Sequence, residues 1–265
     1  MSIKKILLFA IFVLLLFQSH AFSGSDDSES LKNKDGKQQT SECFEGVSRS
    51  IFSFNQGLDR AIFEPIAKGY RKLPAPIRTG SSNVVSNLSL LLTIPNNVLQ
   101  GDLKQAGAHT ARLLINSTIG ILGILDPADS MGLQHLGRED YGQTLGTWGA
   151  GTGCYFVLPI LGPTTVRDFS GTVVNFIGGD PWYNVTVKND TNYVKDSDYY
   201  ITRGTDSLDF RAKNIESFDS LERNSVDFYA SVKSLYLQDR KNKISNSKTT
   251  TETQDDSDWE EIETK

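Results

Sequence analysis

The stretch LLINSTIGILGIL, residues 113–125, is almost wholly apolar, and Gly120 and Gly123 interrupt it. A second stretch, LGTWGAGTGCYFVLPILG at 145–162, sets five glycines among aromatic and aliphatic residues. Glycine lets two backbones approach closely, as helices do in lipid, although neither stretch is long enough to span a bilayer. A glycine-rich buried hairpin in a soluble protein fits the same pattern, so both readings stay open.

Around these stretches the apolar residues recur with the period of a helix. One face over 51–62 predicts a helix that Pro65 ends, and Pro76 is expected in the first turn of the next helix. Asp102 is expected to cap a helix that follows it, and a last helix is expected to run unbroken over 215–235. Short extended pieces are expected near 155–159 and 182–187. The sequence therefore predicts a mainly α protein.

The two ends of the chain differ in composition from the middle. Lys4 and Lys5 precede an apolar run over 6–17, which predicts a signal peptide over 1–21, cleaved after Ala21; an uncleaved anchor is the alternative. Residues 22–42 and 241–265 are polar and predict a disordered tether and a disordered acidic tail, with the folded domain over 43–240. No cysteine precedes Cys43, so the exported chain is not expected to be a lipoprotein.

Charge and motifs exclude several classes of function. The net charge of −5 disfavours nucleic acid as a partner. His109 and His135 are the histidines after Ala21, and neither stands in a hydrolase or metal-binding motif. Asp126, Asp129 and Asp140 are expected to cap or form turns. We therefore expect no catalytic residues, no metal and no cofactor, and hence no enzyme.

The order of motifs resembles the MlaA/VacJ family. The chain is similar to that family in FEGVSRSIFSFNQGLD at 44–59, in YGQTLGTWGAGTG at 141–153, in LPILGPTTVRD at 158–168 and in the ending LYLQDR at 235–240. Single residues in the same order include Arg78, Asn83, Arg112 and Asp126. The resemblance covers essentially all of 43–240.

This resemblance implies a ring of amphipathic helices around a central lipid channel, with the glycine-rich hairpin near 113–125 as part of its lining. It implies intermembrane phospholipid transport at the periplasmic face of the outer membrane. Phospholipid misplaced in the outer leaflet would pass through the channel to a periplasmic lipid-carrier protein, which maintains lipid asymmetry, and a trimeric porin would hold the ring. The alternative is a soluble periplasmic lipid-binding or scaffolding protein that is not embedded in the membrane.

The resemblance also suggests which residues line or gate the channel. These candidates are Asn83, Val84, Asn87, Asn116, Ile119, Gly120, Gly123, Leu125, Gly142, Leu145 and Gly146. Cys43 and Cys154 both stand where many relatives have proline, which favours a disulfide between them. From the residues alone, pairing and free thiols both remain open, although an oxidising compartment favours pairing.

Overall fold

Helices α4 (Ala75–Leu99) and α5 (Leu103–Thr118) form an antiparallel pair joined by a short turn. Pro76 lies in the first turn of α4, as expected, because its missing N–H would have no partner there. Asp102 caps α5, and its Oδ1 accepts a hydrogen bond of 2.9 Å from the backbone N–H of Gln105. The computed structural model describes residues 42–186 and 196–245.

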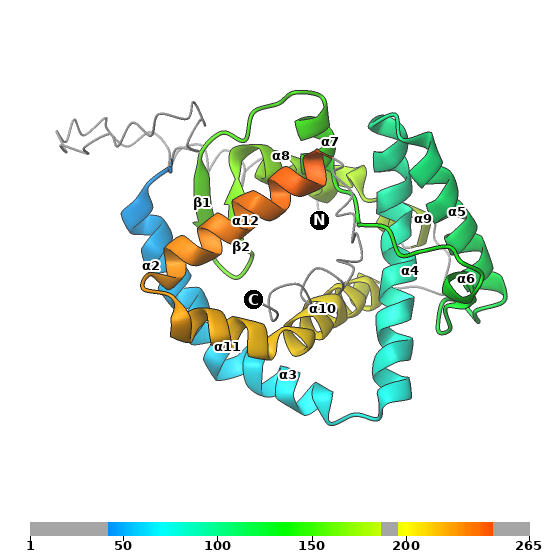
Figure 1. Ribbon diagram of the computed structural model, residues 1–265, viewed down its shortest axis with the longest axis horizontal. Coiled ribbons are helices and arrows are strands. Elements are labelled where there is room, and N and C mark those ends of the chain that lie inside the picture. The colour runs from blue at the N-terminus through cyan, green and yellow to red at the C-terminus, as the bar shows by residue number, and fades with distance from the viewer. Residues whose placement is uncertain (1–41, 187–195, 246–265) are drawn as a thin grey trace, which may run out of the picture. The chain divides into compact units, whose positions relative to one another are not determined.

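The other described elements complete a mainly helical architecture. In chain order they are α2 (Glu45–Leu58), the π-helix η1 (Asp59–Phe63), α3 (Glu64–Arg71), α6 (Pro127–Ser130), α7 (Tyr141–Thr147), β1 (Tyr155–Leu158), β2 (Gly162–Thr165), α8 (Val166–Val174), the π-helix η2 (Asn175–Gly179), α9 (Pro181–Thr186), α10 (Asp196–Lys213), α11 (Ile215–Asn224) and α12 (Phe228–Ile244). Figure 1 shows these elements arranged around a central region, with α4 and α5 on one side and α2, the β-strands and α12 on the other. The mainly α prediction is confirmed.

Three helix boundaries differ from the prediction. Pro65 does not end the first helix, because the π-helical turn η1 precedes it and widens the helix where the proline lacks a backbone donor. The last helix is broken between α11 and α12, where Ser225 is extended and Asp227 starts a new helix by accepting from the N–H of Ala230. Residues 241–244 are helical, not part of the expected tail, because Ile244 packs against Gly146.

The expected extended pieces have different outcomes. Strand β1 confirms the first, and it pairs antiparallel with β2 in a hairpin whose register joins Tyr155 to Thr165. The second is wrong, because residues 181–186 form α9: Asp180 caps it with an oxygen 2.9 Å from the N–H of Trp182, and Pro181 fits its first turn. The predicted signal peptide, nearly all of the tether and residues 246–265 of the tail lie outside the described residues.

The glycine-rich stretch at 113–125 is the end of α5 followed by a turning loop. Gly123 has a φ of +88°, which is costly for residues with a Cβ, and an added Cβ would lie 2.8 Å from the Cβ of Asn87. The loop therefore reverses the chain tightly against α4. No described helix is both long and apolar enough to cross a bilayer.

Polar side chains fill much of the interior. Thr93, Asn96 and Asn97 of α4, His109 and Arg112 of α5, and Gln143 and Thr144 of α7 are all nearly inaccessible to solvent; we call this group the polar seam. Thr144 donates to Asn96 Oδ1 at 2.6 Å, which ties α7 to α4. Within the described residues, small clusters of buried apolar side chains form around Tyr155 and Tyr229 and around Ala67 and Ile215.

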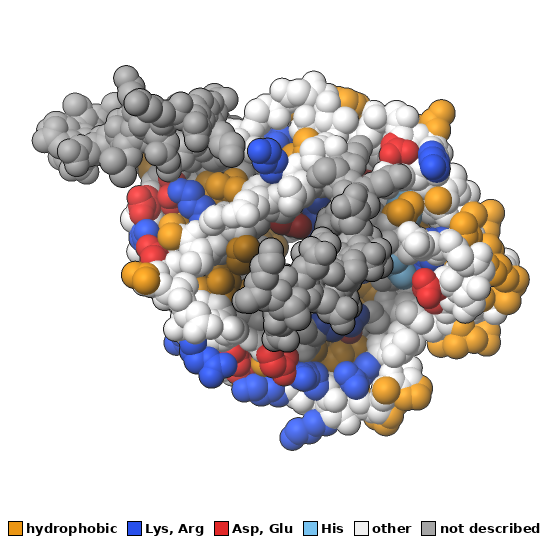
Figure 2. Space-filling model, viewed as in Figure 1, with side chains coloured by type: hydrophobic (Ala, Val, Ile, Leu, Met, Phe, Trp, Pro, Cys, Tyr) orange, Lys and Arg blue, Asp and Glu red, His pale blue; other side chains and the backbone are white. Residues whose placement is uncertain are grey.

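Large apolar side chains are instead found on the outside. A group on α5 and the segment that follows it is between about half and three-quarters exposed, and we call it the apolar belt: Leu114, Ile119, Ile121, Leu122, Leu125 and Met131. Figure 2 shows hydrophobic side chains gathered along this edge, over α5 and α6. Exposed apolar patches of this kind mark surfaces that contact a membrane or another protein.

A disulfide joins Cys43 to Cys154, with Cα atoms 5.4 Å apart, and so fastens the start of the domain to the base of the hairpin. The Cys43 N–H also donates to the carbonyl of Tyr155 at 2.9 Å. The bond closes a loop with a sequence separation of 111 residues.

We predict that reduction of this disulfide lowers the melting temperature. A crosslink over a loop on the order of 100 residues contributes up to about 4–5 kcal/mol in the chain-entropy model. This corresponds to a shift of roughly 10 °C or more. Calorimetry with and without reductant measures it, and the Cys43→Ser/Cys154→Ser double variant should not respond to reductant. Free thiols on both residues in protein isolated without reductant would contradict the prediction.

Candidate functional site

Two pockets meet at the tip of the β1–β2 hairpin, and Gly162 and Pro163 line both of them. The larger has a volume of about 540 Å³ and is enclosed mainly by apolar side chains of α2, η1, α10, α11 and α12; we call it the apolar pocket. The smaller, about 270 Å³, lies beside α7, α8 and α12 and has charged and hydroxyl groups; we call it the polar pocket. The two pockets adjoin at the hairpin tip, where Tyr236 also lines both, and we refer to them together as the hollow.

Aromatic and aliphatic side chains give the apolar pocket its character. They come from helices far apart in the sequence: Phe52, Leu58, Phe63, Phe210, Phe218, Leu221, Phe228, Val232 and Leu235. Phe210 and Leu235 are 59% and 52% exposed, so part of this surface is open to an occupant. Ligand-binding pockets typically measure roughly 300–1,000 Å³ and are mostly apolar.

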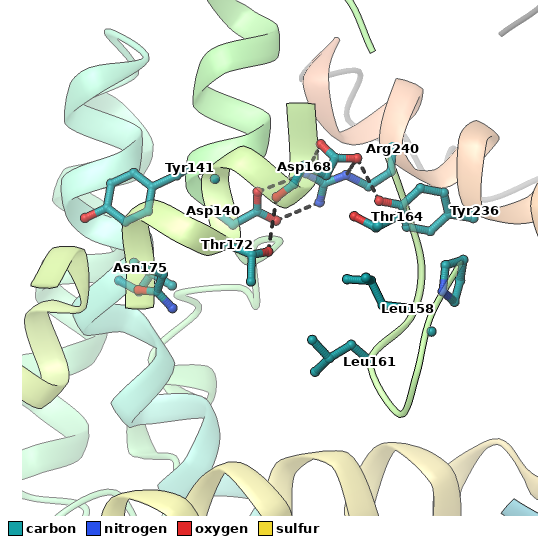
Figure 3. A pocket seen from close by; sticks show the side chains of 14 residues that line it. Asp140, Tyr141, Leu158, Leu161, Thr164, Asp168, Thr172, Asn175, Tyr236 and Arg240 are labelled. Carbon is teal, nitrogen blue, oxygen red and sulfur yellow. Dashed lines mark hydrogen bonds and ion pairs between the residues drawn. The ribbon is translucent and has the colours of Figure 1, made fainter. Parts of the chain in front are cut away.

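An ion cluster centred on Arg240 lines the polar pocket. Its guanidinium donates to Asp140 at 2.6 and 2.9 Å and to Asp168 at 2.9 and 3.1 Å. Tyr236 donates to Asp168 at 2.7 Å, and Arg167 donates to it at 2.9 and 3.0 Å. Figure 3 shows Asp140, Asp168 and Tyr236 converging on Arg240 at the wall of the polar pocket.

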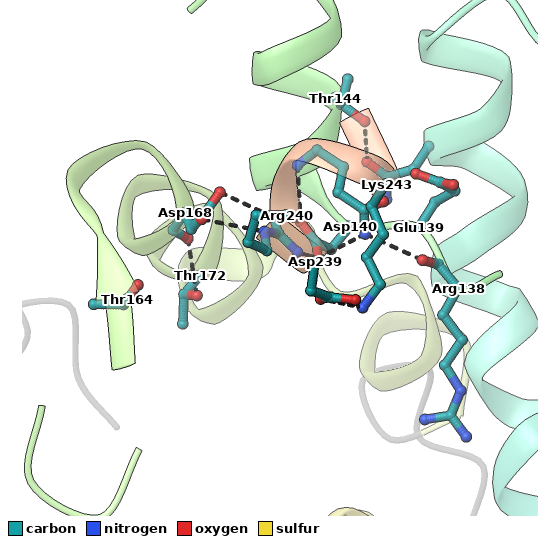
Figure 4. Close-up of polar contacts among 12 residues, drawn as sticks. Arg138, Glu139, Asp140, Thr144, Thr164, Asp168, Thr172, Asp239, Arg240 and Lys243 are labelled. Atoms are coloured by element: carbon teal, nitrogen blue, oxygen red, sulfur yellow. Dashed lines mark hydrogen bonds and ion pairs between the residues drawn. The ribbon is translucent and has the colours of Figure 1, made fainter. Parts of the chain in front are cut away.

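Local structure places each member of the cluster. Asp140 caps α7 by accepting from the N–H of Gln143, and Asp168 lies in the first turn of α8, which Thr165 caps. Arg240 reaches both carboxylates from α12, as Figure 4 shows. Anions at helix starts are stabilised by the helix dipole as well as by the arginine.

The cluster sets the charge of its members. Burial favours a neutral Asp140, but the hydrogen bonds and charge of Arg240 outweigh burial and lower the pKa of Asp140 to about 2. Burial likewise opposes ionisation of Asp168, yet Arg240 lowers the pKa of that carboxyl too. Burial, with the neighbouring Asp168, raises the pKa of Tyr236. At neutral pH the two carboxylates are therefore charged and the Tyr236 phenol is neutral.

The hairpin tip between the two pockets is held on both sides of its turn. Asn55 of α2 donates to the carbonyl of Leu158 at 2.9 Å and accepts from the N–H of Ile160 at 2.8 Å. At the other end of β1, the Cys43–Cys154 disulfide holds the base. Ile160 and Leu161, both more than 60% exposed, project from the tip.

Most of the candidate channel residues gather between α4, α5 and the loop after α5. Asn83 donates to the carbonyl of Ile124 at 3.0 Å, Asn87 to Ser117 at 2.9 Å, and Asn116 to Asp126 at 2.9 Å. Gly120 and Gly123 lie in the same loop, whereas Ile119 and Leu125 belong to the apolar belt. Val84 lies on another face of α4, in a depression shared with α10. Asn83 and Val84 lie well inside α4.

The remaining candidates lie in α7, beside the ion cluster. Gly142 packs against Gly171 of α8: a Cβ on Gly142 would lie 2.7 Å from Asp168 Oδ1 and 2.9 Å from Arg240 Nη2. Gly146 packs closely against Ile244. Leu145 lies between Gly142 and Gly146 along α7. None of the candidate residues lines the apolar pocket.

Sequence reasoning missed the hairpin tip, Asn55 and the Arg240 cluster as parts of one site. The available signal was a polar residue on an otherwise apolar helix face at Asn55, and an arginine on the last helix at Arg240. Asp126 and Asp140 do cap helices, as expected. His109 is buried within α5, His135 lies 3.2 Å from Asp126, and the described residues contain no cluster of three potential metal ligands.

Comparison with known proteins gives consistent matches. The MlaA lipoprotein family matches residues 40–243. The "Intermembrane phospholipid transport system lipoprotein MlaA" of Haemophilus influenzae is 31% identical over 230 residues, which is 82% of this chain and 85% of the relative. The protein of the same name from Escherichia coli K12 is 33% identical over 206 residues, covering 76% of this chain and 78% of the relative.

A solved structure agrees with the sequence matches. It was reported under "Structural basis for maintenance of bacterial outer membrane lipid asymmetry", and it superposes with a TM-score of 0.66 at 29% sequence identity. The match covers 77% of this chain and 99% of that one. Since the family match spans the described domain and the relatives match over most of their length, the chain belongs to the MlaA lipoprotein family.

Proposed function

We propose that this chain transports phospholipid between membranes by passing it through the hollow formed by the apolar and polar pockets. The observation that carries this proposal is the junction of the two pockets at Gly162 and Pro163. Phospholipid has an apolar part that favours the walls of the apolar pocket. Its headgroup needs polar partners to replace water, and the hydroxyl oxygens of Thr164, Thr172 and Tyr236 line the polar pocket as acceptors, since these groups donate their protons to Asp168 and Thr165.

The direction and the partners of the transport extend this proposal. Following its relatives, the chain would remove phospholipid misplaced in the outer leaflet of the outer membrane and pass it to a periplasmic lipid-carrier protein, so that lipid asymmetry is maintained. A trimeric porin would hold it in place. Recovery of a porin trimer and of the carrier in cross-linked complexes tests these assignments. We propose that the transport involves no chemical reaction.

The distribution of side chains supports a membrane location. The apolar belt faces outward while the polar seam is buried, the reverse of a typical soluble domain. Both cysteines of the 265 residues are joined to each other, so neither thiol is free to carry an acyl chain. We therefore propose that apolar side chains, not an acyl group on cysteine, hold the protein at the periplasmic face of the outer membrane.

The substitution Leu235→Asp is predicted to impair lipid transport. This side chain lines the apolar pocket, and a carboxylate there raises the free energy of an acyl chain beside it. An increase of about 1.4 kcal/mol would lower the phospholipid that co-purifies with the protein roughly tenfold. Lipid extraction and mass spectrometry measure this, and detergent sensitivity of cells reports the lost barrier. Val226→Asp is the matched control, because Val226 is fully exposed and lies outside the pocket. Equal lipid content in both variants would disprove the assignment.

A second prediction concerns membrane attachment. After a carbonate wash the protein should stay in the membrane pellet, and its intact mass after extraction should show no acyl addition. Recovery in the periplasmic supernatant would instead support a soluble lipid-binding or scaffolding protein. An excess mass equal to a diacylglyceryl or fatty acyl group would contradict the proposed mode of attachment.

A third prediction tests gating by the α4–α5 region. Deletion of Asn83 and Val84 rotates the rest of α4 by about 200° relative to its start. The deletion removes the hydrogen bond from Asn83 to the carbonyl of Ile124, and the rotation takes Asn87 away from Ser117 and from its close contact with Gly123. We expect a passage that no longer closes and a dominant permeability defect when the deletion is expressed beside the intact chain. Normal detergent resistance, despite stable variant protein in the membrane, would refute this gate.

A further inference from the structure

A separate pocket of about 340 Å³ lies at the corner where α3, α4 and α10 meet. We call it the corner pocket. Three cationic side chains, Arg71, Arg78 and Lys213, line it together with one carboxylate, Asp209. None of its lining residues lines the apolar pocket or the polar pocket.

The carboxylate of the corner pocket is already matched by neighbours. Asp209 accepts hydrogen bonds from Tyr70 at 3.3 Å and from Ser82 at 2.9 Å, and Lys213 lies 2.7 Å from it. Lys213 also donates to Ser82 at 2.6 Å. Asp209 and Lys213 therefore offset each other, and the two arginines give the pocket its positive charge.

Arg78 is held by one hydrogen bond from its Nε, and its two Nη groups remain free to bind a ligand. Its Nε donates to the carbonyl of Leu73 at 3.1 Å, which fixes the plane of the guanidinium at the α3–α4 turn. Its two Nη groups have no hydrogen-bond or ion-pair partner among residues 42–186 and 196–245. A guanidinium with a free pair of donors matches the oxygens of a phosphate, which it binds bidentately.

Arg71 can contribute to the same ligand. It pairs with Glu216, but the two side chains are 40% and 69% exposed, so the pair adds little stability and exchanges readily with solvent. The hydroxyl of Thr79, which also lines the pocket, supplies a neutral donor. The pocket thus presents two arginines and a hydroxyl around one volume.

Apolar side chains flank this cationic pocket. Leu73 in the turn and Ile77 in the first turn of α4 are 41% and 56% exposed. In Figure 2, Lys and Arg side chains gather along the edge formed by α3 and α11, and hydrophobic side chains lie at the α3–α4 corner. A phosphate bound beside exposed apolar groups is the arrangement expected at the surface of a bilayer, where anionic lipids attract basic residues.

We propose that the corner pocket binds the phosphate of an anionic phospholipid in the surrounding bilayer, with Arg78 as its principal contact. This lipid is distinct from the one in transit through the hairpin pockets, with which its site shares no residue, although Asn83 of the proposed gate also lines the corner pocket. Bound there, it orients the α3–α4 corner at the membrane surface. The proposal does not depend on transport and stands or falls separately.

The test is a titration of the purified full-length chain, in a non-ionic detergent at low salt, with dihexanoylphosphatidylglycerol. Arg78→Gln should weaken binding about tenfold, the effect of losing one bidentate charged contact. Arg71→Gln should weaken it less, and Arg78→Lys should fall between wild type and Arg78→Gln. Lys104→Gln is the matched control, since it removes one exposed charge on α5, away from the pocket, and should leave the affinity within about twofold.

Two further ligands identify the source of the phosphate. Dihexanoylphosphatidylcholine should bind more weakly than the anionic lipid, and inorganic phosphate should bind more weakly still, because it lacks acyl chains for Leu73 and Ile77. Inorganic phosphate binding as tightly as the anionic lipid would overturn the proposal, as would phosphatidylcholine binding as tightly as phosphatidylglycerol. If Arg78→Gln lowers the melting temperature of the protein, the affinities of Arg71→Gln and Lys213→Gln for the anionic lipid are compared with wild type instead. Wild-type affinity in those two variants would overturn the proposal, and weaker affinity in both would support it.

Discussion

The guanidinium of Arg240 is the constraint on which the domain's closure depends. It is 8% exposed, and a charge so far from water needs nearby carboxylates to be tolerated at all. Asp140 and Asp168 supply them from the starts of α7 and α8, so α12 can dock only where both helix starts are already adjacent. The close approach of Gly142 to Gly171 makes that adjacency possible. Removing one member of such a buried group typically costs about 3–5 kcal/mol, because the remaining charges lose their partners.

Other polar side chains are buried elsewhere in the domain, as Arg240 is. In a typical soluble protein the largest buried side chains are aliphatic or aromatic, whereas here they include Arg112, His109, Asn96 and Asn97. The helices that carry the polar seam bury little apolar surface against one another, and hydrogen bonds such as Thr144 to Asn96 join them instead. Apolar side chains are thereby left on the outside, where lipid is a better solvent for them than water. The buried polar seam and the exposed apolar belt are therefore two sides of one arrangement.

The sequence predicts those features that depend on neighbouring residues. The caps at Asp102, Asp126 and Asp140 and the mainly helical class follow from local patterns. Pro65 was misleading because its effect is absorbed by one widened turn, which no local rule signals. Asp180 with Pro181 starts a helix where the sequence predicted an extended piece over 182–187.

The candidate site was harder to predict than the fold because it joins residues distant in sequence. Asn55 contacts the hairpin from more than 100 positions away, and Arg240 reaches Asp140 across 100 positions. Both residues lie in segments that resemble the family, 44–59 and 235–240, but nothing in the sequence shows that these segments meet at the hairpin. The resemblance to a known family directed attention to Asn83, Asn87 and Asn116, which do gather at one place, but that place is the α4–α5 pair and not the wall of the apolar pocket.

The way the hairpin is fastened limits how a passage between the two pockets can open. Its base is covalently tied to the start of the domain, and Asn55 bonds the backbone on both sides of Pro159. A swing of the hairpin as a rigid flap about this fixed base would therefore break both Asn55 hydrogen bonds. Ile160 and Leu161 at the tip are exposed and make no such bonds through their side chains. Opening by side-chain rotation at the tip, or by a shift of α12 against the hairpin, costs less than displacing its backbone.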